Sequence, residues 1–430
     1  MTLLDPERIT IAGALERLMR HGIPFRFEAY DGSTTGDPAS PYTVRLLNQR
    51  GLAFLVTAPG DLGFARAYVA GDLEIEGVHP GDPYPLMTEI LSKLSFKLPP
   101  PAELVKIVRG LGVGNLVPPA PPVEEHLPRW RRTLEGLRHT KVRDADAIHH
   151  HYDVSNRFYE LVLGPSMAYT CAVYPTADAT LEEAQAEKFD LVCRKLDLQP
   201  GQRLLDVGCG WGGMVMHAAE HYGVKVLGVT LSQEQAEWAQ KAIKERGLEH
   251  LAEVRFSDYR DVLESGFDAI SSIGMTEHIG VKNYPAYFSF LRDKLAVGGR
   301  LLNHCITRRD NVSPTSAGAF IDRYVFPDGE LAGSGTIVST VQDVGLEVRH
   351  TENIREHYAR TLEAWCANLE RNWDEALREV SLGRAKIWGL YMAGSRIAFE
   401  RDEIELHHVL AVKNAPDGTS GFPLRPTWLS

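Results

Sequence analysis

Glycines that follow an apolar run are the first residues here whose types and spacing point to chemistry. Residues 204–207 read Leu-Leu-Asp-Val, and glycine follows at positions 208, 210, 212 and 213. A strand, a glycine turn and a helix let a ligand approach the backbone closely, because glycine has no side chain in the way. Asp206, Gly208, Gly210 and Gly212 are therefore candidate cofactor residues. A tight turn without a ligand is the alternative that this pattern leaves open.

The next expected strand, residues 225–230, narrows the choice of cofactor. It ends in Thr230-Leu-Ser rather than in Asp or Glu. A dinucleotide site uses an acidic residue at this place to bind ribose hydroxyl groups. The absence of an acidic residue here argues against a nicotinamide cofactor and favours another nucleoside cofactor, with S-adenosylmethionine (SAM) as the first candidate.

Ionisable residues at two further strand ends could handle a proton. Glu277 and His278 follow the apolar run 267–273, and His304 closes the run 299–304. Strand ends in open α/β sheets point into the ligand crevice, so Glu277 and His304 together are candidate catalytic residues. Either residue alone would more often be structural. The three adjacent histidines at 149–151 cannot all face one ion, so we expect no metal site there.

Composition limits the classes of protein that can carry these groups. The chain has 430 residues, of which 44% are hydrophobic and 24% charged, and its net charge is −11. These values are typical of a two-domain globular protein and argue against a nucleic-acid partner. We expect no signal peptide and no stretch apolar enough to cross a bilayer. Five cysteines without paired spacing fit reduced thiols in a cytoplasmic protein.

Alternating strands and helices must position the candidate residues. We expect an α/β fold with a doubly wound, mostly parallel sheet in a domain over residues 145–430. A smaller α+β domain is predicted over residues 1–97. The helical region 358–400 is too long for a plain connection and predicts a lid or a pocket wall. The predicted strands are 25–29 and 72–76 in the small domain, and 204–207, 225–230, 253–256, 267–273, 299–304, 346–350 and 404–411 in the large one.

Residues 98–144 are predicted to connect the two domains. Prolines crowd both ends of 98–128, as is typical of a linker or strap. Residues 129–143 follow, with six basic residues and one acidic residue, a net charge of +5 in an acidic chain. Trp130, Leu134 and Leu137 are interleaved with these charges. A basic helix with apolar anchors can lie on an anionic membrane, and a solvated helix face is the alternative.

Several of these motifs resemble those of the cyclopropane-fatty-acyl-phospholipid synthase family, which includes the mycolic acid cyclopropane synthases. The resemblance covers residues 145–412, and the N-terminal domain resembles that of the members that act on phospholipids. It implies a Rossmann-like, SAM-dependent methyltransferase domain and an accessory domain that recruits lipid or forms a homodimer. The motifs that carry it are residues 151–156, 167–172, 206–213, 230–232 and 274–280.

Two details resemble a branch of the family with a different product. Residues 164–167 read Gly-Pro-Ser-Met, and residues 326–331 read Phe-Pro-Asp-Gly-Glu-Leu, where many cyclopropane synthases have Phe-Pro-Gly-Gly. Members of that branch convert oleoyl chains of phospholipids into 10-methylene chains, which a partner flavin reductase converts to 10-methyl chains. The resemblance implies this product, with a cyclopropane ring as the runner-up.

The resemblance also assigns individual residues. In the family, side chains and one backbone amide surround a bound bicarbonate, and they fall here on Cys171, Glu277, His304, Tyr358 and Ile306. Contacts to SAM fall on Tyr152, Thr170, Gly208, Gly210, Thr230, Gln235, Asp258, Tyr259 and Ile273. Asp144 and Asp146 depart from the family pattern, and either could supply a carboxylate in place of bicarbonate.

The implied reaction explains the need for such a site. A cis alkene has no proton to lose beforehand, so the protein must position the methyl donor and exclude water from the cation that forms. Aromatic faces can stabilise that cation, and the candidates are Tyr169, Tyr174, Tyr284, Tyr287 and Trp365. Proton loss before a hydride shift closes a cyclopropane ring, and proton loss after it gives a methylene branch. The catalytic residues alone therefore do not predict the product.

The sequence thus predicts a cytoplasmic enzyme at the inner face of the membrane that methylates phospholipid acyl chains. Two alternatives stay open. A methyltransferase for a small soluble substrate would not bind vesicles, and a lipid-binding protein with an inactive site would not bind SAM.

Overall fold

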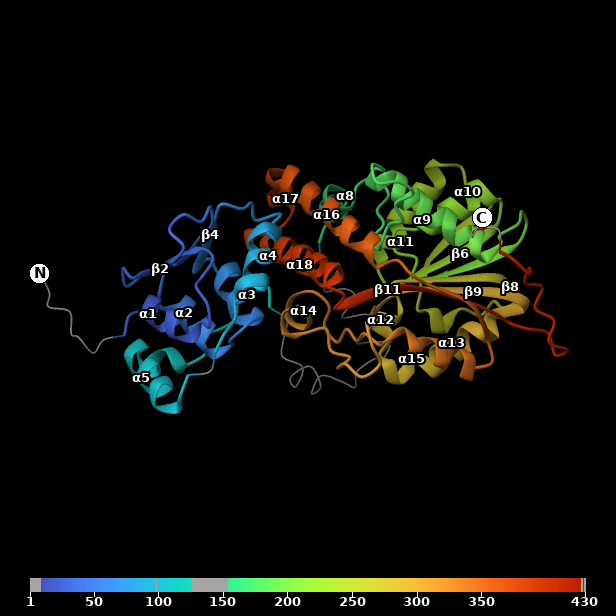
Figure 1. The fold of residues 1–430 in the computed structure, drawn as a ribbon. Coiled ribbons are helices and arrows are strands. Elements are labelled where there is room, and N and C mark those ends of the chain that lie inside the picture. Colours follow the sequence, from blue (N-terminus) through green and yellow to red (C-terminus); the bar gives the residue numbers. More distant parts are fainter. Residues whose placement is uncertain (1–8, 98, 126–153, 427, 429–430) are drawn as a thin grey trace, which may run out of the picture. The chain divides into compact units, whose positions relative to one another are not determined.

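The computed structural model describes residues 9–97, 99–125, 154–426 and 428, which form two compact units (Figure 1). The first unit contains the described residues before 126 together with 319–324 and 369–397. The second unit contains the remaining residues, and it carries most of the predicted site. The segments 319–324 and 369–397 thus group with the N-terminal unit, whereas the linear division drawn from the sequence has them in the large domain.

A four-stranded sheet in the order β2-β1-β3-β4 lies in the N-terminal unit. β1 pairs parallel with β3, and the other pairs are antiparallel. Buried Phe27 and Ala29 alternate with exposed Arg26, which confirms the predicted strand. The strands are β1 (Arg26–Ala29), β2 (Thr34–Gly36), β3 (Thr43–Leu46) and β4 (Leu73–Glu76). The helices are α1 (Ile11–Leu18), α2 (Gln49–Thr57), α3 (Asp61–Val69), α4 (Tyr84–Lys93), α5 (Pro101–Leu111), η1 (Val113–Leu116), α14 (Ala319–Tyr324) and α17 (Trp373–Glu379).

Residues 99–125 are part of the N-terminal unit, although the sequence predicts a linker there. The side chain of Glu125 is fully buried. Its carboxylate accepts hydrogen bonds from Nε and Nη2 of Arg66 at 2.7 and 2.6 Å and from the Tyr324 hydroxyl at 3.1 Å, and it pairs with Arg323. A buried carboxylate is tolerated only with such partners, so these bonds fix the end of the segment within the unit.

A seven-stranded sheet in the order β10-β11-β9-β8-β5-β6-β7 forms the centre of the second unit. The strands from β5 to β9 are parallel, and β11 lies antiparallel between β9 and β10. All seven strands predicted for this domain are confirmed, and the sheet is mostly parallel as expected. The strands are β5 (Arg203–Val207), β6 (Lys225–Thr230), β7 (Ala252–Phe256), β8 (Phe267–Ile273), β9 (Leu295–Arg308), β10 (Glu347–Asn353) and β11 (Ile404–Val412).

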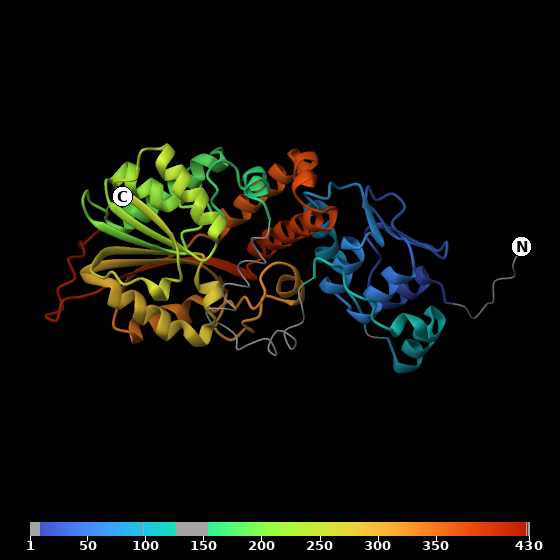
Figure 2. The same cartoon turned by 180° about the vertical axis from the view of Figure 1, so that it is seen from behind.

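Helices cover both faces of this sheet, as Figures 1 and 2 show. One apolar cluster joins the sheet to α9, α10 and α11, and a second joins it to α13 and α15. Because both faces are covered, four successive residues of the interior strand β5 are buried, rather than every second one. The helices are α8 (Asn156–Leu163), α9 (Leu181–Leu196), α10 (Gly213–Tyr222), α11 (Gln233–Glu245), η2 (Tyr259–Asp261), α12 (Thr276–Ile279), η3 (Val281–Asn283), α13 (Tyr284–Lys294) and α15 (Ser334–Asp343).

The long helical region predicted at 358–400 forms α16 (Arg355–Arg371), α17 and α18 (Leu382–Glu400). The first part of α16 belongs to the second unit, and most of α18 belongs to the first. All five cysteines are buried free thiols, as their spacing predicts. Among the residues that the structure describes, no helix has the length and apolarity that crossing a bilayer requires.

Candidate active site

The glycine turn after β5 leaves space for a ligand beside its backbone. Gly208, Gly210 and Gly212 adopt the left-handed conformation, with φ of 75°, 54° and 77°. A Cβ atom on Gly208 would lie 2.2 Å from Sδ of Met275, whereas one on Gly210 would meet no described atom within 4 Å. α10 begins at Gly213, so unpaired amides of its first turn lie at the same end of β5. The turn therefore fits the close approach of a ligand at Gly210, as the sequence predicts.

Polar side chains at the ends of β5 and β6 are buried and paired. The Asp206 carboxylate accepts a hydrogen bond from Oγ of Ser271 at 2.6 Å. Burial raises the pKa of Asp206 to about 6, although the Ser271 bond and the charge of Lys188 act in the opposite direction. Thr230 Oγ1 donates to Oε1 of Gln235 at 2.7 Å. These bonds hold the polar groups at the carboxyl edge of the sheet, where cofactor contacts are predicted.

The other predicted cofactor residues on β7 and β8 lie along the same edge. Asp258 follows β7, and its carboxylate accepts hydrogen bonds from the backbone N–H and Nη2 of Arg260 at 2.8 and 2.6 Å. Tyr259 packs edge-on against aromatic rings of α13, with centroids 5.2 Å apart. Ile273 closes β8 and is paired in register with His304 of β9. The sheet thus brings the predicted cofactor residues and His304, a candidate for proton transfer, to one edge.

Lys188 of α9 is a buried cation behind this edge that the sequence patterns did not reveal. Its residue is 1% exposed, and Nζ donates to Oγ1 of Thr170 at 2.9 Å. Burial lowers the pKa of Lys188 to about 7, against the raising effect of Cys171 and Asp206. Nε2 of Gln185, one helical turn earlier, donates to the Thr170 carbonyl at 2.9 Å. α9 therefore positions Thr170, a predicted SAM contact, through two polar side chains.

Glu277 presents a carboxyl group that can exchange a proton near neutral pH. It lies in the short helix α12, and its Oε1 accepts a hydrogen bond from the backbone N–H of Ile306 at 2.8 Å. Burial raises the pKa of Glu277 to about 7, although the Ile306 amide lowers it. The backbone N–H of Glu330 donates to the Glu277 carbonyl at 3.0 Å and holds α12 in place. The Ile306 amide, which the resemblance assigns to bicarbonate, is bonded to Glu277 in this structure.

His304 is a buried imidazole with one ring nitrogen directed away from its partner. The residue is 1% exposed, and its Nδ1 lies 2.8 Å from Nε2 of His408 in β11. Nε2 of His304 has no hydrogen-bond partner among the described residues. Burial and the charges of Lys188 and Lys195 hold the pKa of His304 well below its usual range. The ring is therefore neutral at physiological pH and can offer one N–H or one lone pair to the site.

The loop that carries Cys171 is bound to α16. Cys171 is fully buried, and burial raises the pKa of its thiol, so the group stays protonated. The backbone N–H of the next residue, Ala172, donates to Oγ1 of Thr361 at 3.0 Å. Tyr358, one turn earlier in α16, is buried and stacks on Phe399 with ring centroids 4.5 Å apart. Cys171 can thus contribute through its position but offers no thiolate.

Aromatic side chains pack together between the Cys171 loop, α16 and α12. Tyr169 lies 5.5 Å from Trp365 and 6.4 Å from Phe326, measured between ring centroids. Phe326 in turn packs edge-on against His278 of α12 at 5.5 Å. Tyr169 and Trp365 therefore remain candidates for stabilising a cation.

The other aromatic candidates have different surroundings. The ring of Tyr174 lies 4.0 Å from the guanidinium carbon of Arg360, and its hydroxyl donates to the Arg360 carbonyl at 3.2 Å. Tyr284 and Tyr287 pack inside the apolar cluster of α13. These contacts do not decide which rings meet the reacting cation, so the roles of Tyr174, Tyr284 and Tyr287 stay predictions.

The motif Phe326-Pro-Asp-Gly forms a turn with unusual backbone geometry. Asp328 adopts φ of 65°, in the left-handed region that favours glycine, and it is buried. Many cyclopropane synthases have glycine at this position by the resemblance described above. The turn thus keeps the backbone that glycine would adopt while it carries a carboxylate.

Three predicted features lie outside the described residues. They are the SAM contact Tyr152, the carboxylates Asp144 and Asp146, and the basic segment 129–143. Their roles stay predictions.

The comparisons with known proteins identify the family and support the fold. A family model described as mycolic acid cyclopropane synthetase matches residues 139–409. The chain belongs to this family. It is 60% identical over 422 residues to "Probable fatty acid methyltransferase Rv3720" of Mycobacterium tuberculosis, which covers 98% of this chain and 99% of that protein. It is 35% identical over 271 residues to the cyclopropane-fatty-acyl-phospholipid synthase of Escherichia coli K12, which covers 62% of this chain and 68% of that protein.

A solved structure supports the same membership. The mycolic acid cyclopropane synthase CmaA1, complexed with SAH and CTAB, has a TM-score of 0.58 and 33% sequence identity over 62% of this chain and 97% of that chain. The predicted Rossmann-like fold and the family are confirmed. This member of the synthetase family is a SAM-dependent methyltransferase of the class that modifies fatty acids and lipids.

In this family member, the sequence patterns did not reveal the polar residues that lie behind the predicted site residues. Gln185, Lys188 and Lys195 fall on one face of α9 at spacings of three and seven residues, together with apolar Ala184 and Val192. Polar residues within an otherwise apolar helical stripe are the signal that could have revealed them. The role of each individual residue at the site stays a prediction.

Proposed function

We propose that this enzyme methylates the cis double bond of oleoyl chains in phospholipids and releases 10-methylene chains. The observation that carries the proposal is the carboxyl group of Glu277, which is held by the Ile306 amide and has a pKa raised to about 7. Methylation of an alkene ends with the loss of a proton from carbon, so the site needs a proton acceptor that works near neutral pH. Methyl transfer to an oxygen or nitrogen nucleophile would instead need a proton acceptor before the methyl group is transferred.

The proposed sequence of bond changes fits the groups at the site. Bound SAM supplies an electrophilic methyl group on a sulfonium sulfur. The π electrons of the alkene form the new carbon–carbon bond as the carbon–sulfur bond breaks, which leaves a cation at the neighbouring carbon. Tyr169 and Trp365 would face that cation, and the buried surroundings would keep water away from it. A hydride shift moves the cation to the methylated carbon, and loss of a proton from the new methyl group gives the methylene branch.

The acceptor of that proton can be Glu277 itself or an anion that Glu277 and His304 hold. The free Nε2 of His304 is the observation that fits a bound bicarbonate, since a buried polar atom without a partner favours a ligand at that place. Asp144 or Asp146 could supply a carboxylate instead. Alanine at either position, assayed with and without added bicarbonate, tests this alternative, and full activity in both variants would exclude it.

We place the methylene product before a cyclopropane ring, and the higher identity to a relative named as a fatty acid methyltransferase is consistent with this order. A protein named as a fatty acid methyltransferase is 60% identical along nearly the whole chain, whereas the cyclopropane synthase of Escherichia coli is 35% identical over part of it. A cyclopropane product remains the alternative, because one proton acceptor serves both outcomes.

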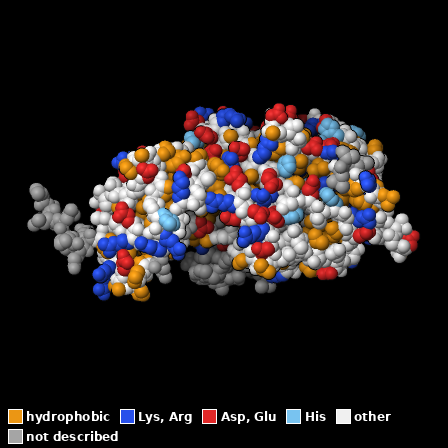
Figure 3. All heavy atoms as spheres, in the orientation of Figure 1, with side chains coloured by type: hydrophobic (Ala, Val, Ile, Leu, Met, Phe, Trp, Pro, Cys, Tyr) orange, Lys and Arg blue, Asp and Glu red, His pale blue; other side chains and the backbone are white. Residues whose placement is uncertain are grey.

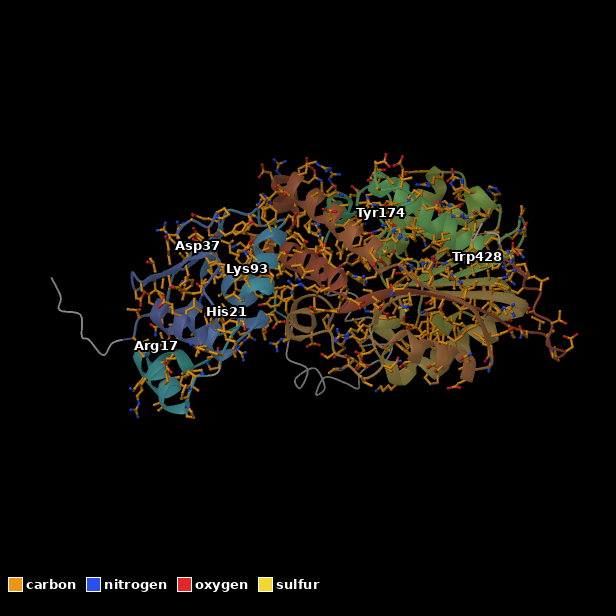
Figure 4. The ribbon with its side chains drawn as sticks, in the orientation of Figure 1. Arg17, His21, Asp37, Lys93, Tyr174 and Trp428 are labelled. Atoms are coloured by element: carbon orange, nitrogen blue, oxygen red, sulfur yellow. The ribbon has the colours of Figure 1, made fainter. Side chains whose placement is uncertain are left out.

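Surface features of the N-terminal unit are consistent with a peripheral membrane enzyme. Figure 3 shows Lys and Arg side chains gathered over the part of this unit that contains α1 and α5. Arg17 and Lys93 come from α1 and α4 (Figure 4), and Phe96, Leu91 and Val105 are 63%, 50% and 48% exposed. Basic and exposed apolar side chains together favour an anionic lipid surface. We propose this attachment, a homodimer and a flavin reductase acting on the product as parts of the same function.

Mass spectrometry of acyl chains tests the proposal. The protein is incubated with dioleoyl phospholipid vesicles and methyl-deuterated SAM, and the Glu277→Gln variant serves as the control. We expect chains that gain one carbon and retain two deuterons of the transferred methyl group, and ozonolysis should cleave them to a mid-chain ketone. Resistance to ozonolysis would mean a cyclopropane ring. The absence of any mass gain would overturn the proposal and favour a soluble substrate or a non-catalytic role.

A further inference from the structure

A chain of buried polar side chains extends from His304 away from the reaction site. His304 of β9 and His408 of β11 are directly opposite each other in the register of the two antiparallel strands. Nδ1 of His304 lies 2.8 Å from Nε2 of His408, and Nδ1 of His408 lies 2.8 Å from Nζ of Lys195. Lys195 also forms an ion pair with Glu352 of β10. Three secondary-structure elements therefore meet behind one catalytic candidate.

Burying these polar groups costs free energy unless they form hydrogen bonds and ion pairs with one another. His408 and Lys195 are 0% exposed, whereas the side chain of Glu352 is 36% exposed. A buried ammonium group needs hydrogen-bond acceptors and an opposite charge, and His408 and Glu352 provide them. The series of hydrogen bonds thus ends at the carboxylate of Glu352, whose side chain is partly exposed to solvent.

The donor at one end dictates the direction of every hydrogen bond in the chain. An ammonium group only donates, so Nδ1 of His408 must accept from Lys195. A neutral His408 then carries its proton on Nε2 and donates to Nδ1 of His304. His304 in turn must carry its proton on Nε2, the nitrogen that has no partner among the described residues.

Burial, together with the surrounding charges, keeps both rings neutral. Burial holds the pKa of His304 and of His408 well below the usual range. Lys188 and Lys195 act on both rings in the same direction, and His304 and His350 also disfavour a charge on His408. A neutral histidine has one N–H, so its tautomer is decided by its partners.

We propose that Lys195 and His408 are positioning residues that fix His304 as an Nε2–H donor towards the reaction site. This inference rests on the proposed function, in which His304 helps to hold an anionic oxygen that accepts the proton from the substrate. An N–H at Nε2 attracts such an oxygen, whereas the opposite tautomer would present a lone pair and repel it. The series of hydrogen bonds from Lys195 through His408 therefore selects the anion-binding tautomer of His304 before any ligand binds.

Nitrogen-15 NMR of the full-length protein with labelled histidine tests the tautomer without any assay of activity. The His304→Gln and His408→Gln variants assign the two rings. We expect protonated Nε2 and unprotonated Nδ1 on both rings, and in Lys195→Met we expect a shift towards the opposite tautomer. A proton on Nδ1 of His304 in the wild type, or an unchanged spectrum in Lys195→Met, would overturn the proposal.

Turnover of oleoyl vesicles gives the second readout. Removing residues that orient a site group from behind typically costs 10–100-fold in affinity or activity at metal centres, and we expect a kcat decrease of about tenfold or more in Lys195→Met and His408→Gln. KM for SAM should stay nearly unchanged, and Lys195→Arg should recover part of kcat. A parallel rise of KM, or no recovery by arginine, would indicate a structural role only.

A matched control is available in the adjacent residue of β11. His407 is also buried, but its Nδ1 bonds to Oγ1 of Thr307 at 2.9 Å rather than to the chain behind His304. We expect His407→Gln to keep kcat within about twofold, as for a change outside the site. If the wild type fails to act on vesicles, the proposed function fails, while the NMR result still decides the tautomer.

Discussion

The carboxyl edge of the large sheet has two halves that differ in the types of residue they contain. The half at β5, β6 and β7 consists of glycine backbone and short polar pairs, such as Thr230 with Gln235 at 2.7 Å. The half at β8, β9 and β11 consists of ionisable side chains: the partly buried Glu277 is bonded to the Ile306 amide, and the buried His304 is bonded to His408. The first half is suited to holding a cofactor, and the second to handling a proton.

Because of this difference, substitutions should separate cofactor binding from proton transfer. The cofactor half depends on backbone conformation, so a change there should alter both cofactor affinity and folding. Charge states carry the proton half, so a change there should act on rate and on the pH dependence of stability.

The largest effect is expected for Glu277→Gln. Loss of a proton acceptor typically costs 10²–10⁴-fold, so we expect kcat on oleoyl vesicles to fall at least ~100-fold. Glutamine keeps an acceptor for the Ile306 amide, and a fall of less than tenfold would contradict the role of Glu277. Vesicle turnover followed by mass spectrometry measures the change.

The same variant should gain stability at alkaline pH. The pKa of Glu277 is raised from 4.5 to about 7 in the folded state, so ionisation opposes folding. The penalty is absent below pH 4.5 and grows until the pH passes about 7. The full shift corresponds to ~3 kcal/mol, and since the residue Glu277 is partly exposed we expect about 2 kcal/mol at pH 8. Denaturant unfolding at pH 8 and at pH 4.5 measures the difference, and an equal effect at both pH values would refute it.

Gly208→Ala should damage the cofactor half, and Gly210→Ala is its matched control. A Cβ at 208 would lie 2.2 Å from the Met275 sulfur at φ of 75°, whereas one at 210 would meet open space at φ of 54°. We expect about 2–3 kcal/mol of destabilisation at 208 and about 1 kcal/mol at 210, because both carry the left-handed penalty but only one carries the clash. Thermal unfolding of the two variants measures this difference, and equal losses would show that the clash is relieved.

Lys188→Met should shift a titration in the cofactor half. The charge of Lys188 lowers the pKa of Asp206, which burial raises to about 6. Without that charge the pKa of Asp206 should rise, and the carboxylate should be lost at a higher pH than in the wild type. Calorimetry of SAH binding at a series of pH values around 6 measures the midpoint. A midpoint that stays in place or moves to lower pH would contradict the coupling.

The smallest effect is expected for Asp328→Gly. Glycine relieves the φ of 65° at this turn but raises the entropy of the unfolded chain, so we expect the free energy of unfolding to change by less than ~1 kcal/mol. The ring of Phe326 contacts Tyr169 and His278, and this variant leaves Phe326 in place, so the methylene product should persist. Ozonolysis of the products measures this outcome, and a change to cyclopropane would place product control in this turn.

The two halves also differ in how well the sequence predicts them. The glycine turn is one continuous segment of strand, turn and helix, so its function can be inferred from neighbouring residues. The contact between His304 and His408 depends on β11 entering the sheet beside β9, and the pattern of β11 predicts a strand but not its neighbour. Lys188 and Lys195 lie among the buried residues of α9, so helical periodicity could indicate their burial, but their partners depend on the tertiary fold.

The most direct test of the division is the affinity of the Glu277→Gln variant for SAH, measured by calorimetry beside the wild type and Gly208→Ala. If the edge is divided as described, Glu277→Gln binds SAH within about twofold of the wild type although its turnover is lost, and Gly208→Ala binds much more weakly. A loss of SAH affinity in Glu277→Gln as large as that in Gly208→Ala would contradict the account.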